Sequence, residues 1–346
     1  MSDISKIDKN FKIETKLNKN DIKFYNVLEH PFKVYGVFYE DGKFRRMPKD
    51  IAKSVNDGVY GLHSHTAGGR VRFKTNSSYI AINAKMPNIG KMSHFAVSGS
   101  AGFDLYVKGE TEVYKKSFIP GFNFESGFES VAEFGNSEMR EVTINFPTYS
   151  EVSELYIGIS DSAQVLEPTP YKYQKPIVYY GSSITQGGCC SRPGNTYEAV
   201  VSRRFDTDYI NLGFSGSARA EDSIAEYIKN LDMSVFVYDY DHNAPTLEHL
   251  KSTHKKMYDI IRKANPDLPI IIMTRPTYEP NISTFAVIKE TYEKAKANGD
   301  NVYYLDGTEL MAVAKNDGTV DGCHPNDLGF YSMAKALGDV LKGILK

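Results

Sequence analysis

The 346-residue sequence has no tryptophan and only three cysteines. Cys189 and Cys190 are neighbours, Cys323 lies far along the chain, and an odd number of cysteines cannot close a disulfide framework. No cysteine pair has the C-x2-C spacing typical of a zinc site. We therefore expect small buried thiols, no metal and no cofactor.

The sequence also lacks an excess of charge of either sign, because 41 Lys and Arg oppose 43 Asp and Glu for a net charge of −2. This balance gives no reason to expect nucleic acid or an anionic membrane as a partner. No run approaches the about 18–20 apolar residues that span a bilayer, and the first twenty residues contain no apolar core of signal-peptide length. We expect a cytoplasmic protein with a small-molecule partner, and a homo-oligomer remains possible.

The hydrophobic pattern changes near residue 165, and the length suits two domains. Before this point apolar and polar residues alternate in short runs between Gly, Asn and Pro turns, which predicts an antiparallel β-sandwich of jelly-roll type. Residues 48–56 alone indicate a helical turn. We expect an N-terminal domain at 1–165 and a linker at 166–175. The alternating runs are 32–39, 69–74, 79–84, 103–107, 140–146 and 154–159.

From residue 176 to 346, candidate strands alternate with amphipathic helices. Five such units predict a flavodoxin-like, doubly wound parallel sheet of five strands with helices on both faces. The last helix is expected to have Pro325 at its first position, where no N–H is needed. The predicted strands are 176–180, 208–212, 234–240, 269–274 and 301–305. The predicted helices are 196–205, 220–231, 246–264, 283–297 and 325–346.

Ligands of such a sheet bind beyond the carboxyl ends of its strands, where this sequence places a serine pair and a histidine. Ser182 and Ser183 follow the first strand, and Asp321 and His324 follow the fifth. A serine hydroxyl needs a base, histidine is the base suited to neutral pH, and a carboxylate can fix the imidazole tautomer. Only one of two neighbouring serines can point its hydroxyl out of the sheet, and Ser182 is the alternative to Ser183.

The same strand ends supply donors for an oxyanion. Gly216 follows the second strand and Asn243 follows the third. Their backbone N–H and side-chain amide, with the N–H of Ser183, would hold the negative charge that forms on an attacked carbonyl. Together these residues fill every role that acyl transfer requires.

These blocks resemble those of the SGNH, or GDSL-type, hydrolase superfamily of esterases. Gly181-Ser182-Ser183-Ile184 stands where the family has Gly-Asp-Ser-Leu, and Asp321-Gly322-Cys323-His324-Pro325 matches its last block in full. The third block keeps Asn243 but lacks the family's preceding Gly and following Asp. The resemblance covers about residues 176–346. It implies that Ser183 is the nucleophile, His324 the base and Asp321 its orienting acid, with Ser183, Gly216 and Asn243 as the oxyanion hole.

The N-terminal half adds a second resemblance. Gly102-Phe103-Asp104-Leu105-Tyr106 looks like the Gly-x-Asp-Leu-Tyr signature of a β-rich domain that precedes one branch of these esterases. That branch also shows a GSSIT first block and a DxDHNAP third block, as at 239–245 here. Related two-domain enzymes deacetylate plant polysaccharides, which implies a carbohydrate substrate.

Four further side chains have open roles. Arg192 follows the serine loop and either contacts substrate or holds that loop in place. His242 adjoins Asn243 and is expected to shape the site and contact substrate. His63 and His65 alternate like ligands on one strand face, but no third ligand is near, and we expect no metal there.

The sequence therefore predicts a metal-independent serine esterase that works through an acyl-enzyme. The favoured substrates are short-chain esters, above all O-acetyl groups on carbohydrates or oligosaccharides. Two alternatives remain. One is a lipid or thioester acylhydrolase with the same site, and the other is a carbohydrate-binding protein on an inactive esterase scaffold.

Overall fold

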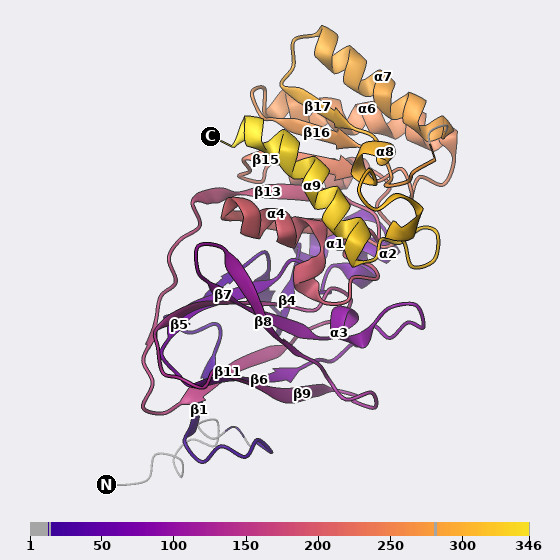
Figure 1. The fold of residues 1–346 in the computed structure, drawn as a ribbon. Helices are drawn as coiled ribbons and strands as arrows, with labels where there is room; N and C mark the ends of the chain where they lie inside the picture. Colours follow the sequence, from indigo (N-terminus) through magenta and orange to yellow (C-terminus); the bar gives the residue numbers. More distant parts are fainter. Residues whose placement is uncertain (1–12, 14, 280–281, 346) are drawn as a thin grey trace.

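The computed structural model describes residues 13, 15–279 and 282–345 of the chain. Figure 1 shows a β-rich half, coloured indigo to pink, below an α/β half coloured pink to yellow. The order of the elements follows the change of hydrophobic pattern near residue 165, because the alternating runs form the lower half and the βα units form the upper one.

The β-rich half contains two antiparallel sheets. The first has the strand order β1-β11-β6-β9, and the second has the order β12-β5-β10-β7-β8 with β2 paired to β5. The first comprises β1 (Ile22–Asn26), β6 (Tyr79–Lys85), β9 (Gly127–Glu133) and β11 (Glu154–Ser160). The second comprises β2 (Lys33–Tyr35), β5 (Arg70–Thr75), β7 (Phe103–Lys108), β8 (Glu112–Phe118), β10 (Arg140–Asn145) and β12 (Val165–Leu166).

The two sheets enclose one hydrophobic core. Ile80 and Ile82 of β6 and Phe103 and Leu105 of β7 are fully buried in the same cluster, although they belong to opposite sheets. Their neighbours Ala81 and Asp104 lie on the opposite faces of these strands, as period-two strands require, and these residues are buried as well. The expected antiparallel β-sandwich is therefore confirmed. A hairpin of β3 (Phe38–Glu40) and β4 (Lys43–Arg45) and the short helices α1 (Lys49–Val55), α2 (Asp57–Leu62) and α3 (Val97–Ser100) complete this half.

The α/β half is built on a five-stranded sheet in the order β14-β13-β15-β16-β17, and all its pairings are parallel. The predicted flavodoxin-like, doubly wound sheet is confirmed. Its strands are β13 (Tyr173–Gly181), β14 (Thr207–Gly213), β15 (Val235–Asp239), β16 (Ile270–Met273) and β17 (Val302–Leu305). Its helices are α4 (Tyr197–Phe205), α5 (Asp222–Ile228), α6 (Leu247–Ala264), α7 (Ser283–Ala297), α8 (Gly307–Leu310) and α9 (Asp327–Ile344).

Helices cover both faces of this sheet (Figure 1). Consecutive residues of β13 enter different cores: Ile177 and Tyr179 pack with α4 and α9, whereas Val178 and Tyr180 pack with α5, α6 and α7. This double burial explains why the strand reads as a continuous apolar run.

Some predicted boundaries differ from the structure. Strand β13 begins at Tyr173, inside the expected linker, and Tyr173 already pairs with Thr207 of β14. The prediction that Pro325 opens the last helix is wrong, because Asn326 is the N-cap and its side chain accepts a hydrogen bond from the Gly329 N–H at 3.1 Å. An Asn cap satisfies a free N–H of the first turn and so fixes the start of α9 after the proline.

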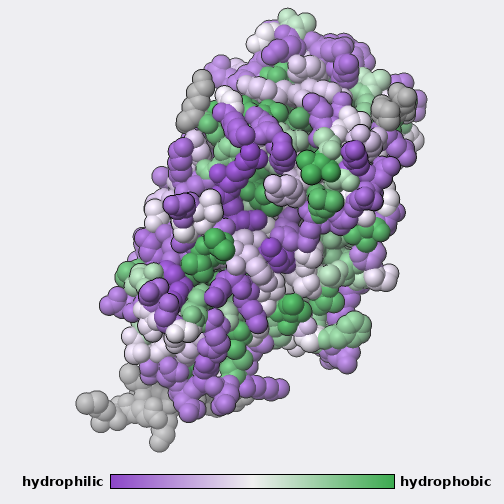
Figure 2. All heavy atoms as spheres, viewed as in Figure 1, coloured by the Kyte–Doolittle hydropathy of each residue, from purple (hydrophilic) through white to green (hydrophobic). Residues whose placement is uncertain are grey.

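The surface in Figure 2 is mostly hydrophilic, and its hydrophobic residues gather in small separate patches. Among the described helices, none combines the length and the apolar character needed to cross a membrane.

Candidate active site

The first three strands of the parallel sheet along the chain, β13, β14 and β15, end level with one another. Gly181 at the end of β13 pairs with Gly213 of β14 on one side and with Asp239 of β15 on the other. The turn after β13 can pack here only because residue 181 lacks a side chain, since a Cβ would lie 2.0 Å from Asp239 Oδ1 and 2.2 Å from Thr185 Oγ1. The loops that follow these strands therefore start at one edge of the sheet.

Ser183, His324 and Asp321 form a continuous chain of hydrogen bonds at this edge. Ser183 Oγ lies 2.9 Å from His324 Nε2, and His324 Nδ1 lies 2.8 Å from Asp321 Oδ2. With Nδ1–H donating to the carboxylate, the lone pair of Nε2 faces the serine hydroxyl. This arrangement suits proton transfer from serine to imidazole.

The Asp321 carboxylate is held both in position and in its ionised form. Burial acts to raise its pKa, but hydrogen bonds from the N–H and imidazole of His324 and from the Cys323 N–H outweigh burial and lower the pKa to about 2. The N–H of His324 lies 2.8 Å from Asp321 Oδ1. An ionised carboxylate therefore orients the imidazole across the neutral pH range.

The structure places only one of the two serines beside the histidine. Ser182 is 1% exposed, and its hydroxyl accepts a hydrogen bond from the Ile184 N–H at 3.2 Å within the turn. Ser183 is 9% exposed and is the residue in contact with His324. The geometry thus favours Ser183 as the attacking group, as the block alignment implies.

Two backbone N–H groups and one side-chain amide are the expected donors to an oxyanion. Among the hydrogen bonds of the described residues, none is donated by the N–H of Ser183 or of Gly216. Gly216 has φ of +67°, which favours glycine, and its Cα faces open space. Asn243 Nδ2 donates to the Phe214 carbonyl at 2.9 Å. Because an amide nitrogen carries two N–H groups, the second can still donate to an oxyanion.

Gln186 joins the serine turn to the Gly216 loop, and the sequence analysis missed it. Its Oε1 accepts from the Ser215 N–H at 3.0 Å, and its Nε2 donates to the Thr148 carbonyl at 3.2 Å. Nε2 also lies 3.2 Å from His65 Nδ1. Its place three residues after Ser183 is the only signal in the sequence, since the partners come from other elements.

The loop that carries His94 and the buried Tyr149 also bring the β-rich half to the site, and the sequence did not predict these two contacts. The Tyr149 hydroxyl donates to the Ser183 carbonyl at 3.1 Å. The Phe95 ring packs edge-on against Tyr149 at 5.3 Å, and the His94 ring lies 5.7 Å from that of His324. The β-rich half therefore helps to form the site.

Arg192 is held by the β-rich half. Its guanidinium lies 3.0 Å from Asp104 Oδ2, bonds the Tyr106 hydroxyl, and stacks 3.9 Å from the Tyr114 ring centroid. Asp104 Oδ2 also accepts from the Gly194 N–H at 2.9 Å. Of the two roles left open for Arg192, these contacts favour support of the loop. The Asp and Tyr of the Gly-x-Asp-Leu-Tyr motif therefore hold the loop that follows the nucleophile turn.

Arg46 is a second, fully buried link between the halves. Its Nε donates to the His65 carbonyl at 2.7 Å, and its Nη atoms donate to the carbonyls of Leu62 at 2.8 Å and Gly213 at 2.5 Å. The guanidinium carbon lies 4.8 Å from the Phe214 ring centroid. Burial lowers the pKa of Arg46 to about 9. The Arg46 side chain thus supports the backbone where β14 ends and the Gly216 loop begins.

The remaining histidines of the sequence analysis have other surroundings. His242 lies near Cys323, with Nδ1 4.0 Å from the thiol sulfur, and burial followed by the charge of Arg275 lowers its pKa to about 4. With this lowered pKa, His242 is uncharged at neutral pH. The expectation that His63 and His65 share a strand face is wrong, because His63 caps α2 and His65 forms an isolated bridge.

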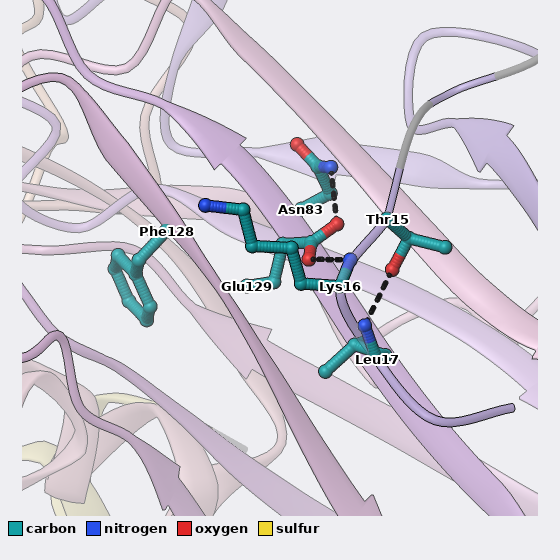
Figure 3. Close-up of a pocket in the computed structure, with 6 residues that line it drawn as sticks. All are labelled: Thr15, Lys16, Leu17, Asn83, Phe128 and Glu129. Atoms are coloured by element: carbon teal, nitrogen blue, oxygen red, sulfur yellow. Dashed lines mark hydrogen bonds between the residues drawn. The ribbon is translucent and has the colours of Figure 1, made fainter.

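The described part of the β-rich half contains several hollows, and two of them differ clearly in their lining. One, of about 490 Å³, is shown in Figure 3 and contains a Glu129 carboxylate bonded to the Lys16 N–H and to Asn83. Its lining residues include no histidine or cysteine. The other, of about 680 Å³, is bounded by the residues on either side of His94 and by the segment around Phe122. This second hollow is mostly apolar and begins at the loop that reaches the site.

Comparison with known proteins agrees with this geometry. The family model described as GDSL-like lipase/acylhydrolase matches residues 174–342, and the model for the N-terminus of SGNH-hydrolase-type esterases matches residues 22–165. A solved structure of the GDSL-like lipase type from Bacteroides ovatus is 28% identical, with a TM-score of 0.81 over 94% of this chain and 98% of that one. No curated protein matches the chain in sequence.

Two more distant solved structures share the fold. A salicylyl-acyltransferase from a tetracycline biosynthetic pathway is 19% identical, with a TM-score of 0.74 over 95% of this chain and 99% of that one. An acetyl xylan esterase from Butyrivibrio proteoclasticus is 12% identical, with a TM-score of 0.60 over 94% of this chain and all of that one, 100%. With the fold, the ordered sequence blocks and both family models in agreement, the chain belongs to the SGNH, or GDSL-like, lipase/acylhydrolase family, in the form that carries a Gly-x-Asp-Leu-Tyr N-terminal domain.

Proposed function

We propose that this member of the GDSL-like hydrolase family is a serine esterase that removes short acyl groups, above all acetyl, from carbohydrates or oligosaccharides. The observation that carries the proposal is the hydrogen-bonded chain from the Ser183 hydroxyl through His324 to Asp321, beside unpaired N–H groups at the strand ends. No metal or cofactor is needed for this chemistry.

In the acylation step, Ser183 Oγ attacks the ester carbonyl while His324 Nε2 takes the serine proton. The Asp321 carboxylate stabilises the imidazolium that forms. The Ser183 and Gly216 N–H groups and the Asn243 amide bind the oxyanion of the tetrahedral intermediate, which is where electrostatic stabilisation has its largest effect. When the intermediate collapses, His324 gives its proton to the departing alcohol.

In the deacylation step, water takes the place of the alcohol. His324 Nε2 removes a proton from the water as it attacks the Ser183 ester, and the same N–H groups hold the second oxyanion. Collapse releases the carboxylic acid and returns the proton to Ser183. Both halves of the reaction therefore use one base at one position.

The carbohydrate substrate is supported at the level of the fold. The chain shares its two-part architecture with proteins described as an acetyl xylan esterase and a family two carbohydrate esterase. Fold alone does not determine substrate, and the proposal therefore depends on direct assay. Release of acetate from a panel of acetylated xylo- and manno-oligosaccharides is the assay that tests it.

A chromogenic acetyl ester tests the enzyme class first. The wild type should turn over the ester, Ser183→Ala should be inactive, and the matched variant Ser182→Ala should keep activity because its hydroxyl serves only the turn. If Ser182→Ala loses activity and Ser183→Ala keeps it, the nucleophile is Ser182 and the assignment to Ser183 is wrong. Oligosaccharide binding by a wild type that turns over no ester would favour a binding protein on an esterase scaffold.

The apolar hollow of about 680 Å³ favours a second candidate, a hydrolase of longer acyl chains. Phe122, which is 84% exposed, and Ile119, which is 55% exposed, line this hollow. Rates on acetyl, butyryl and octanoyl esters separate the two candidates. Preference for octanoyl that is lost in Phe122→Ser would establish the lipid alternative, and preference for acetyl that Phe122→Ser does not change would exclude it.

A further inference from the structure

Three potential metal ligands meet beside the nucleophile. His94, Cys189 and His324 each present one ligand atom, and these atoms lie within 4.8 Å of one another. The residues come from three separate segments: the loop between β6 and α3, the serine turn, and the loop before α9. The mechanism uses only His324.

The His94 side chain is exposed on a well-anchored turn. His94 occupies a central position of the turn closed by the hydrogen bond from the Phe95 N–H to the Met92 carbonyl at 3.2 Å. Phe95 is 4% exposed and packs edge-on against Tyr149. The backbone is thus fixed while the imidazole is free to rotate toward the site.

The Cys189 thiol is largely buried and has no role in the proposed mechanism of ester hydrolysis. Cys189 has φ of +72°, in the left-handed region that a non-glycine residue seldom adopts, and is 7% exposed. Burial, followed by the charges of Asp321 and Cys323, raises the pKa of Cys189 to about 11. A protonated thiol is a weak nucleophile at neutral pH, but it can lose its proton to a bound metal ion.

We propose that His94, Cys189 and His324 form a binding site for Zn²⁺ that inhibits the enzyme when it is filled. Two imidazoles and one thiolate are a donor set that Zn²⁺ prefers, with a water molecule in the fourth tetrahedral position. Ligand atoms of tetrahedral zinc lie about 3.3–3.6 Å apart. A movement of about 1 Å, which the exposed His94 side chain can supply, is enough to close the site.

The existing contacts of His324 suit a metal ligand. Its Nδ1–H donates to the Asp321 carboxylate at 2.8 Å, and such a carboxylate partner commonly orients zinc-bound histidine. That leaves Nε2, the atom that faces Ser183, as the ligand atom.

Inhibition follows from the shared nitrogen. A zinc ion on His324 Nε2 occupies the lone pair that must accept the Ser183 proton, so the ion and the acylation step exclude each other. As the metal–sulfur bond forms, the Cys189 thiol releases its proton to solvent. This inhibitory effect rests on the proposed esterase function, whereas binding itself does not.

The first experiment measures inhibition of acetyl-ester turnover by Zn²⁺, with Mg²⁺ as the comparison ion and EDTA to reverse the effect. Zn²⁺ should inhibit the wild type, and His94→Ala and Cys189→Ser should each have an inhibition constant at least about tenfold above that of the wild type. The inhibition of each variant is measured against its own uninhibited rate. His30→Ala, which removes another exposed histidine of the β-rich half, should leave the constant unchanged. Equal inhibition of all four proteins would overturn the proposal.

The second experiment needs no catalytic activity and uses Co²⁺ as a spectroscopic probe. Wild-type protein should show a thiolate-to-cobalt charge-transfer band with the intense visible bands of tetrahedral cobalt, and added Zn²⁺ should remove them. Cys189→Ser should lose the charge-transfer band, whereas Cys323→Ser should retain it. Absence of the band in the wild type would overturn the site. Its presence in a protein without esterase activity would overturn the proposed function and leave the metal site standing.

Discussion

Removal of the Asp104 carboxylate should loosen the nucleophile loop from a distance. Asp104 is fully buried, and its oxygens accept from Arg192 at 3.0 Å, from the Gly194 N–H at 2.9 Å and from Asn145 at 2.8 Å. Asp104→Ala leaves a guanidinium, a backbone N–H and an amide without their acceptor. No substrate contact is lost, so any effect on catalysis must act through the loop.

The size of the effect follows from the burial of the pair. Breaking a buried ion pair by removing one partner costs about 3–5 kcal/mol. The Arg192 side chain is 20% exposed and keeps its stack on Tyr114, which places the expected loss of stability near 3 kcal/mol. The Gly188 N–H holds the Ser183 carbonyl at 2.8 Å in the same loop. Because a misplacement of about 1 Å can cost about a hundredfold in rate, kcat/KM should fall by about ten- to a hundredfold.

Urea unfolding followed by far-ultraviolet circular dichroism measures the stability, since the chain has no tryptophan to report by fluorescence. A double-mutant cycle of Asp104→Ala and Arg192→Ala should give a coupling energy of about 1.5–3 kcal/mol. The control is Lys108→Ala, which breaks another ion pair between the two halves, to Asp206 at 3.1 Å, that is partly exposed. Its loss should stay below about 1 kcal/mol.

Three results would refute the reasoning. They are equal losses for Asp104→Ala and Lys108→Ala, a coupling energy below about 0.5 kcal/mol, and an unchanged kcat/KM in a variant that has lost the expected stability. The last would mean that Asp104 supports the fold but not the position of Ser183.

Three further changes test other parts of the site. Asp321→Asn should lower kcat by about a hundredfold or more with little change in KM, because a neutral amide does not stabilise the imidazolium. A fall of less than about tenfold in steady-state assays would show that His324 works without it. Burial raises the pKa of Asp239 from 3.8 to about 8, so between these values the folded state binds the extra proton and the free energy of unfolding falls as pH rises, by at most about 1.4 kcal/mol per unit. The Tm of Asp239→Asn minus that of the wild type should therefore increase from about pH 5 to about pH 8. A Tm difference that stays constant over this range would contradict the prediction. Arg46→Met should lower the free energy of unfolding by about 2–4 kcal/mol, because it leaves the buried Gly213 carbonyl and other carbonyls without their hydrogen-bond donor. An unchanged urea midpoint would contradict this prediction.

The α/β half was predictable because its pattern is determined locally. Residues 177–180 form an apolar run that fits a strand buried on both faces, and α7 was expected at its observed bounds, Ser283–Ala297. Strand β8, which reads EVYKKSF, was missed because most of its residues are exposed at a sheet edge and show no alternation. A strand of this kind is specified by its neighbour rather than by its own sequence.

The residues of the site also differ in whether a local pattern predicts them. The rule that ligands bind at strand ends brought Ser183, Asp321 and His324 together from the sequence, because parallel strands end at one edge. His94 and Tyr149 could not be found in this way. Their positions depend on how the β-rich half docks, and neither a period nor a motif in their own segments records that contact.

The Asp104 contact also has a consequence for how the enzyme is made. The β-rich half precedes the α/β half in the chain, so the Asp104 carboxylate contacts a loop that is synthesised after it. The position of the nucleophile loop therefore depends on contacts that are complete only when both halves have folded. A chimera that takes its first half from a relative would need to bring the acceptor and its guanidinium partner together.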